Sequence, residues 1–315
     1  TQLKQYQQKL QMLLGYDVSH VKMHIPDTII RNAGLYNDPN FTQIPKMIVA
    51  QASVQVAKFQ KEQTKLSAYP TINIKGMPNA YPTVPEQRQE DYYNSLKYYI
   101  NFHPRIKKIL FVENSGWPLD RLQETTQENP HNKQIEFISL DANDFPRDFG
   151  KGYGETLLIE QGILKSALVK ESSYIAKITG RIYLLNMTDI LERVKSPFEC
   201  LCDFKWPIWQ QLQNKQNNPS YADTRFLVFS KCFYERYLQP MHKNHQQGCF
   251  YSEHRYYQAI NLASQSANVC KRFPVEPKFS GIAGHFEGKD YNSRSEQLKY
   301  AIRVLTRQTM PWLYL

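Results

Sequence analysis

The stretch SYIAKITGRIYLLN, residues 173–186, has the apolar, β-prone composition of a strand but carries Thr179, Gly180 and Arg181 in its middle. Glycine inside such a run marks a bend or a close approach of the backbone to another group. Two interpretations of Arg181 are therefore open. It pairs with a surface carboxylate at a bend in the strand, or it faces an anionic ligand under which the chain passes.

The segments before this stretch alternate between strand-like and helix-like patterns. The predicted elements are strands 71–76, 106–116 and 135–144, and helices 86–102 and 154–170. The first of these helices places Tyr92, Leu96 and Tyr99 on one face. Strands that alternate with helices at this spacing favour an α/β fold with a mixed, mostly parallel sheet flanked by helices.

The ends of the chain differ from this middle part. Residues 1–65 are rich in Gln and Lys and have helical apolar spacing, which predicts a helical N-terminal extension. Residues 66–195 carry the regular alternation, and residues 196–315 form a less regular second half. Within that second half we expect a strand at 225–230, helices at 252–266 and 296–308, and a glycine-rich loop at 278–293.

The composition is that of an ordinary globular protein, and the net charge indicates which kinds of partner to expect. Hydrophobic residues make up 41% and charged residues 22% of the sequence, which argues against disorder. The formal net charge of +10 favours anionic partners, among them phosphorylated substrates or an anionic membrane surface. Because the Lys and Arg residues are dispersed and no nucleic-acid-binding motif is found, we expect no nucleic acid as a partner.

The cysteines indicate whether the protein binds a structural metal, and the apolar runs indicate whether it spans a membrane. The 5 cysteines show no repeated spacing, so we expect reduced thiols and no structural metal. No apolar run approaches the roughly 18 residues of a membrane helix, and no signal peptide opens the sequence. We therefore expect a cytoplasmic protein, with peripheral attachment to the inner face of the membrane left open.

Polar residues stand where the predicted strands end. Glu113, Asn114 and Ser115 follow one apolar run, Asp141 and Asp144 follow the next, and a Thr-Gly-Arg unit interrupts the stretch quoted first. In open α/β sheets ligands bind beyond the carboxyl ends of the strands. These positions are thus candidates for the floor of a site, although solvated loops also explain polar strand ends.

The motifs VENSG (112–116), GKGYGE (150–155) and KITGRIYLLN (177–186), with a late basic segment, resemble GT-A-fold glycosyltransferases, in particular uncharacterised bacterial enzymes for capsule and surface polysaccharides. The resemblance covers roughly residues 70–310. It implies that residues 66–195 bind a nucleotide-sugar donor and that residues 196–315 bind a glycan or lipid-linked glycan acceptor and close the site.

The resemblance also implies how the donor is held. Many members of the family hold a metal with an Asp-x-Asp motif, where this chain has Ile178-Thr179-Gly180-Arg181. We therefore expect no metal ligands, with Arg181 on the donor phosphate; Asp141 and Asp144 leave Mn or Mg open. No other cofactor is expected. The full set of expected donor-binding residues is Glu113, Asn114, Ser115, Lys151, Thr179, Gly180, Arg181, His285 and Lys289.

The order of glycines in GKGYGE does not match a P-loop, so we interpret this segment as a flexible lead-in to a helix. Within it Lys151 is the candidate for donor phosphate, and Glu155 is a candidate helix cap or sugar ligand.

An inverting transfer needs a carboxylate base, which in this family often begins a late helix. Glu253 occupies such a place and Asp223 is second, although the helix dipole alone also favours an acid there. Trp206, Trp209 and Tyr221 are expected at the acceptor, with core packing as the alternative for the tryptophans.

Three other classes of protein stay open on the sequence. A non-catalytic domain of the same fold is compatible with the missing acidic pair. A basic nucleic-acid-binding α/β protein is suggested only by charge. A Rossmann-type enzyme is disfavoured, because KGMPNAYP (75–82) stands where the Gly-x-Gly-x-x-Gly turn would be.

Overall fold

The structure is a computed structural model that describes residues 65–72, 82–102, 106–142, 144–145, 149–194, 197–205, 220–239, 241, 252–284 and 289–310. The predicted N-terminal extension, apart from its last residue, lies outside these ranges. Among the described residues, no helix is long and apolar enough to cross a membrane.

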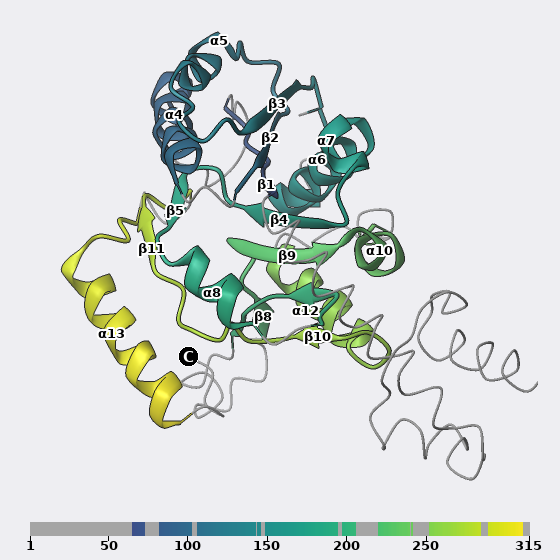
Figure 1. The fold of residues 1–315 in the computed structure, drawn as a ribbon, viewed down its shortest axis with the longest axis vertical. Helices are drawn as coiled ribbons and strands as arrows, with labels where there is room; N and C mark the ends of the chain where they lie inside the picture. Colours follow the sequence, from purple (N-terminus) through teal and green to yellow (C-terminus); the bar gives the residue numbers. More distant parts are fainter. Residues whose placement is uncertain are drawn as a thin grey trace, which may run out of the picture.

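The elements follow one another through the chain as shown in Figure 1. They are β1 (Lys65–Ala68), α4 (Pro85–Asn101), β2 (Lys108–Glu113), α5 (Asp120–Gln123), η1 (Glu124–Gln127), β3 (Gln134–Ser139), α6 (Gly150–Lys165), α7 (Ala167–Lys170), β4 (Tyr174–Ile178), β5 (Ile182–Leu184), α8 (Met187–Arg193), β6 (Cys200–Leu201), β7 (Phe204–Lys205), β8 (Tyr221–Ala222), β9 (Phe226–Ser230), α10 (Lys231–Phe233), η3 (Tyr234–Leu238), α12 (Ser252–Ala263), β10 (Val269–Cys270), β11 (Phe279–Gly281) and α13 (Arg294–Thr309).

A seven-stranded sheet in the order β10-β6-β9-β4-β1-β2-β3 forms the centre of the molecule. β4, β1, β2 and β3 are parallel neighbours, whereas β9 runs antiparallel to both β4 and β6. The predicted fold class, a mixed and mostly parallel sheet flanked by helices, is confirmed. The sheet takes strands from both sides of residue 195, and the division of the chain into halves stays a prediction.

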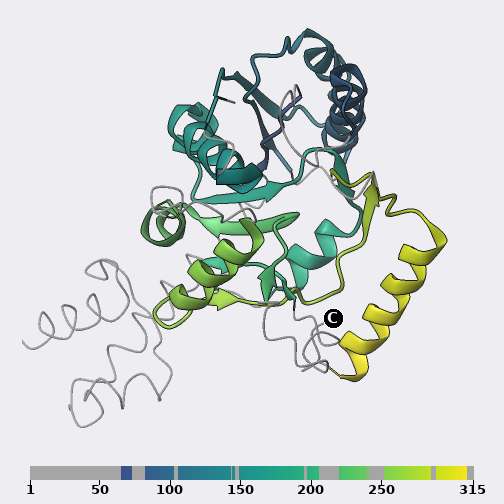
Figure 2. The same ribbon diagram turned by 180° about the vertical axis from the view of Figure 1, so that it is seen from behind.

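Helices cover both faces of the sheet because the central strands are apolar on both sides. Along β2, Ile109 and Phe111 face the core under α4, while Leu110 and Val112 face the core under α6 and α12. Figures 1 and 2 show α4 and α6 on opposite faces. The predicted inner face of α4 is confirmed: its side chains Tyr92, Leu96 and Tyr99 are buried.

Two predicted boundaries in the first half are wrong. The first strand, β1, ends at Ala68, before the predicted start at residue 71, and Ile72 follows in a bend; residues 73–76 of the predicted strand lie outside the described residues. The predicted helix 154–170 is two helices, because the Ser166 side chain accepts a hydrogen bond from the backbone N–H of Val169 and starts α7 as an N-cap.

Residues 150–155, predicted as a flexible lead-in, instead form the first turns of α6. The glycines serve close packing. A Cβ on Gly152 would lie 2.7 Å from the backbone N of Ser252, and one on Gly154 would lie 2.6 Å from the ring of Phe145. Glycine is therefore needed here for contact between α6 and its neighbours, at some cost in helix propensity.

The stretch 173–186 also differs from the single strand that its composition predicts. It forms β4 and β5, which belong to different sheets and are separated by the turn at 179–181. β5 pairs antiparallel with β11, with Gly281 opposite Ile182. The segment 278–293, predicted as a loop, thus contributes a strand that brings the C-terminal part of the chain against this turn.

Gly162 in α6 gives a direct test of this packing. A Cβ there would lie 2.8 Å from Cε1 of Tyr69 and 2.9 Å from Cγ2 of Val112. We expect Gly162→Ala to lower the free energy of unfolding by about 1–2 kcal/mol, because overpacking outweighs the gain in helix propensity. Urea unfolding measures this, with Leu164→Ala at an exposed position of the same helix as the control. An unchanged or higher stability for Gly162→Ala would contradict the packing.

Candidate active site

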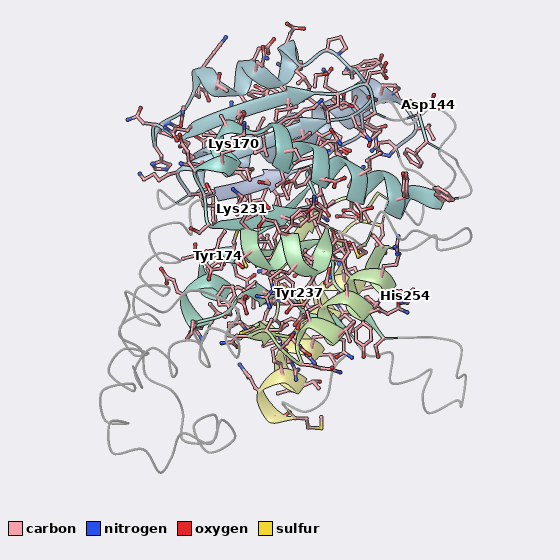
Figure 3. All side chains as sticks on the ribbon, turned by 90° about the vertical axis from the view of Figure 1, so that its right-hand side faces the viewer. Asp144, Lys170, Tyr174, Lys231, Tyr237 and His254 are labelled. Atoms are coloured by element: carbon pink, nitrogen blue, oxygen red, sulfur yellow. The ribbon has the colours of Figure 1, made fainter. Side chains whose placement is uncertain are left out.

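The carboxyl ends of the parallel strands and the start of β9 lie at one edge of the sheet. Ala68 pairs with Phe111 and with Ile178, and Ile178 pairs with Phe226. In Figure 3 Asp144, which follows β3, and His254, near the start of α12, lie on this edge. Lys170, Tyr174 and Lys231 lie on the opposite side in the same view. The polar strand ends singled out in the sequence are thus brought together.

Glu113 joins the loops that follow β1 and β2. Its side chain is fully buried, and its carboxylate accepts hydrogen bonds from the backbone N–H groups of Ile72 (3.0 Å), Ser115 (2.9 Å) and Trp117 (3.1 Å), and from the Ser115 hydroxyl. Next to it, Oδ1 of Asn114 accepts a hydrogen bond of 2.6 Å from the Thr71 hydroxyl. These residues fix the shape of the edge, and their contact with a donor stays a prediction.

Two buried arginines lie beside these loops. Arg181 lies 3.7 Å from Asp91 and 5.8 Å from the ring centre of Tyr92, both on α4. Arg88 donates from Nε and Nη2 to the carbonyl of Thr71, at 2.9 and 2.6 Å. Burial lowers the pKa of Arg88 and the charge of Arg181 lowers it further. The three charged groups of this cluster comprise two cations and one carboxylate, which suits an anionic ligand.

Gly180 faces protein and not open space. A Cβ on Gly180 would lie 3.1 Å from Cε1 of Tyr92 and 3.4 Å from Cβ of Ala68. Glycine at this position lets the turn after β4 pack under α4.

A pocket of about 230 Å³ lies next to the start of β9, where Asp223 and Arg225 line it. It brings together four of the predicted site residues, namely Tyr221, Asp223, Glu253 and Lys289. The backbone N–H of Thr179 donates to the carbonyl of Arg225 at 2.9 Å. This hydrogen bond joins the arginine cluster and the pocket at one point of the sheet edge.

Asp223 is held in a tight ion pair within this pocket. Its carboxylate accepts from Nε of Arg225 at 2.8 Å, from the same residue's backbone N–H at 3.1 Å and from Nη2 at 2.5 Å. Burial acts to raise the pKa of Asp223, but the charge and hydrogen bonds of Arg225 prevail and lower it to about 2. Asp223 is therefore an ionised group with a fixed partner.

Glu253 has the opposite electrostatic setting. Burial raises the pKa of Glu253, and the nearby carboxylates of Glu155 and Asp223 add to this, against its own backbone N–H and Lys177. The Ser252 hydroxyl lies 3.0 Å from Glu155 and 3.4 Å from Glu253, and Lys177 pairs with Glu155 at 2.5 Å. A carboxylate with a raised pKa is suited to take up a proton at neutral pH.

The remaining predicted site residues fall into two groups. Trp206, Trp209 and His285 lie outside the described residues, as does the side chain of Lys151. Lys289 lines the pocket and pairs with Glu296 at 2.9 Å. Among the residues that the structure describes, no cluster of three or more His, Cys, Asp or Glu side chains could hold a metal ion.

The sequence reasoning missed Arg88, Asp91 and Lys177. Arg88, Asp91 and Tyr92 are separated by three and four residues on a predicted helix, so their shared face could have been read from spacing. Lys177 in the middle of an apolar strand was a further signal, because a buried lysine requires a partner.

Comparisons with known proteins show no family for this chain. No family model and no curated protein matches the chain. Among solved structures, it is similar to the inositol-1-phosphate CTP transferase from T. maritima, at 11% identity, TM-score 0.42, and coverage of 80% of this chain and 99% of that one. It is also similar to core-mannan synthase A from Aspergillus fumigatus in its Mn/GDP form, at 10% identity, TM-score 0.42, and coverage of 78% and 84%.

The galactosyltransferase LgtC, in complex with donor and acceptor sugar analogs, is similar at 10% identity and TM-score 0.39, with coverage of 66% and 72%. These similarities concern the arrangement of sheet and helices. The chemistry of the chain must be argued from its own side chains.

The ion pair of Asp223 predicts a specific pH dependence of stability. Its folded pKa of about 2 lies below the ordinary value of about 3.9, so its stabilisation is complete above about pH 4 and is lost as the pH falls toward 2. We expect Asp223→Asn to lower the free energy of unfolding at neutral pH by about 3 kcal/mol, because Arg225 then stays buried without its partner.

Urea unfolding between about pH 7 and about pH 3 measures this effect. Asp120→Asn, at an exposed position of α5, is the control. The assignment is contradicted if Asp223→Asn loses stability with acid as steeply as the unaltered protein.

Proposed function

We propose that this protein is a glycosyltransferase that moves a sugar from a nucleotide-sugar donor to a glycan or lipid-linked glycan acceptor. The observation that carries the proposal is that a cationic cluster and a pocket are connected at Thr179. Arg181 of the cluster follows Thr179 by two residues, and Arg225 of the pocket accepts the hydrogen bond of the Thr179 backbone N–H. The pocket also contains Glu253, a carboxylate of raised pKa. Transfer from a sugar diphosphate needs both the cluster and this carboxylate, since a charged leaving group departs as a proton is taken up.

In this proposal the donor lies over the loops after β1, β2 and β4. Arg181 binds the diphosphate, with Arg88 beside it, and no metal is required. Asn114, Ser115 and Thr179 contact the nucleoside, with Glu113 holding the loops after β1 and β2 in place. Further proposed contacts to the donor come from the backbone of Gly180 and from Lys151, His285 and Lys289.

Glu253 acts as the base. It takes the proton of the acceptor hydroxyl while that oxygen attacks the anomeric carbon, and the bond from this carbon to the phosphate oxygen breaks. The nucleoside diphosphate leaves with the electron pair, and Arg181 balances its charge. Asp223 is the weaker candidate because a carboxylate with a pKa of about 2 has little tendency to accept a proton.

The acceptor enters the pocket on the side of Tyr221, Tyr291 and Tyr300, with Trp206 and Trp209 as further proposed contacts. Aromatic faces suit the apolar faces of sugar rings. An acceptor carried on lipid at the inner face of the membrane would fit the net charge of +10, and a role in surface polysaccharide or capsule synthesis follows from such an acceptor.

The donor site is tested by thermal stabilisation against CMP, UDP, GDP and their sugars, each with manganese and with EDTA. We expect one nucleotide to stabilise the protein in EDTA, and Arg181→Ala to weaken its affinity about 100-fold, because a charge-assisted contact to phosphate is lost. Arg121→Ala, which removes an exposed arginine from α5, is the matched control. Stabilisation only with manganese would contradict the role of Arg181 and direct attention to Asp141 and Asp144.

Turnover separates transfer of a sugar from transfer of a nucleotide. Release of nucleoside diphosphate from a nucleotide sugar supports the proposal. Release of pyrophosphate from CTP and a sugar phosphate would assign a nucleotidyltransferase. Absence of any nucleotide binding would favour a non-catalytic domain.

Glu253→Gln tests the base. We expect kcat to fall by about 10²–10⁴-fold while the affinity for the nucleotide is unchanged. In the unaltered protein, activity should fall as the pH drops through the raised pKa of Glu253, because its protonated form cannot accept a proton. A variant that keeps full turnover and the same acidic limb would exclude Glu253 and return the role to Asp223.

A further inference from the structure

The C-terminal helix α13 turns its apolar residues away from the protein. Leu298, Ile302 and Leu305 are 63%, 50% and 61% exposed, and their spacing of four and three residues places them in one stripe. A helix that packs on a globular core normally turns such a stripe inward. In Figures 1 and 2 α13, in yellow, lies along the side of the molecule, with no other drawn helix or strand on its outer side.

Polar contacts hold the inner side of the helix. Its buried residues are Glu296 and Thr306. Near its C-terminal end, Arg307 lies 3.0 Å from Asp203 and 2.6 Å from Glu276, two carboxylates that are themselves buried. The helix is therefore fixed to the body without its apolar stripe, which stays available for another surface.

The charges on the outer side have one sign. The exposed positions of α13 include Arg294 and Lys299 and no acidic residue. The one acid of the helix, Glu296, is buried between Lys289 and Lys299 at 2.9 and 2.7 Å. Residues 311–315, PWLYL, which follow in the sequence, include Trp312 and Tyr314, and Trp and Tyr are enriched at membrane interfaces.

We propose that the outer face of α13, defined by Arg294, Leu298, Lys299, Ile302 and Leu305, docks on an anionic lipid surface. An apolar stripe flanked by basic side chains is the pattern of helices that lie in the plane of a bilayer interface. The opposite side of the same helix lines the pocket with Gln297, Tyr300 and Arg303. Docking would hold the pocket close to the membrane, where a lipid-linked acceptor, as in the proposed function, is found.

The test is flotation of the full chain with vesicles of phosphatidylcholine alone and with phosphatidylglycerol added. We expect binding to the anionic vesicles, and a loss of about ten-fold or more in the variant Leu298→Ser, Ile302→Ser, Leu305→Ser. Arg294→Gln should weaken binding to the vesicles that contain phosphatidylglycerol and leave binding to phosphatidylcholine vesicles unchanged. Leu262→Ser, which alters a leucine of α12 that is 67% exposed, should bind as the unaltered protein does.

Other outcomes overturn the proposal. Absence of binding to anionic vesicles, or equal binding by the triple variant, excludes the docking face. A change in oligomeric state in the triple variant would assign the stripe to a second copy of the chain. A lower melting temperature of that variant without vesicles would assign it to another part of the same chain. Turnover with a short, water-soluble acceptor should be the same in the triple variant, so failure of the docking proposal and failure of the transferase proposal are distinguishable.

Discussion

The antiparallel pairing of β9 with β4 is the constraint on which the candidate site depends. It places the segment that starts β9, with Asp223 and Arg225, against the end of β4. A parallel strand in this position would carry the same segment to the opposite edge of the sheet. Because β5 continues from the turn at 179–181 and pairs with β11, the C-terminal part of the chain is brought to the same point. Residues far apart in the sequence therefore surround one edge.

Electrostatic setting, more than residue type, distinguishes the groups at this edge. Asp223 is a buried carboxylate and Glu253 a half-buried one, and both line the pocket. The pKa of Asp223 is lowered by Arg225, while the pKa of Glu253 is raised by burial. Burial raises the pKa of Asp91, and the charges of both Arg181 and Arg88 act against this increase. The proposed transfer uses the carboxylate of raised pKa to accept a proton and the cationic cluster to bind the donor phosphate. The fixed pair of Asp223 and Arg225 lines the pocket.

The sequence predicts elements that follow from a local residue pattern. It does not predict features that depend on contacts between residues far apart in the chain. The runs that became β2, β3 and β9 and the spacing of α4 and α13 sufficed for the fold class. β1 was misplaced because KLSA is short and only half apolar, and the glycines before α6 were misread because their reason is the contact with α12. The order of residues in α13 predicts an amphipathic helix. Only the structure shows that its apolar side faces outward.

The most direct test of the central claim is amide hydrogen exchange with and without the nucleotide sugar that stabilises the protein. The claim is that the arginine cluster and the pocket form one site joined at Thr179. It predicts protection on binding in residues 69–72, 113–117 and 179–181, extending to 223–225, with α7 and the amino ends of the strands unchanged. Protection confined to another region, or absent at 179–181, would contradict the claim.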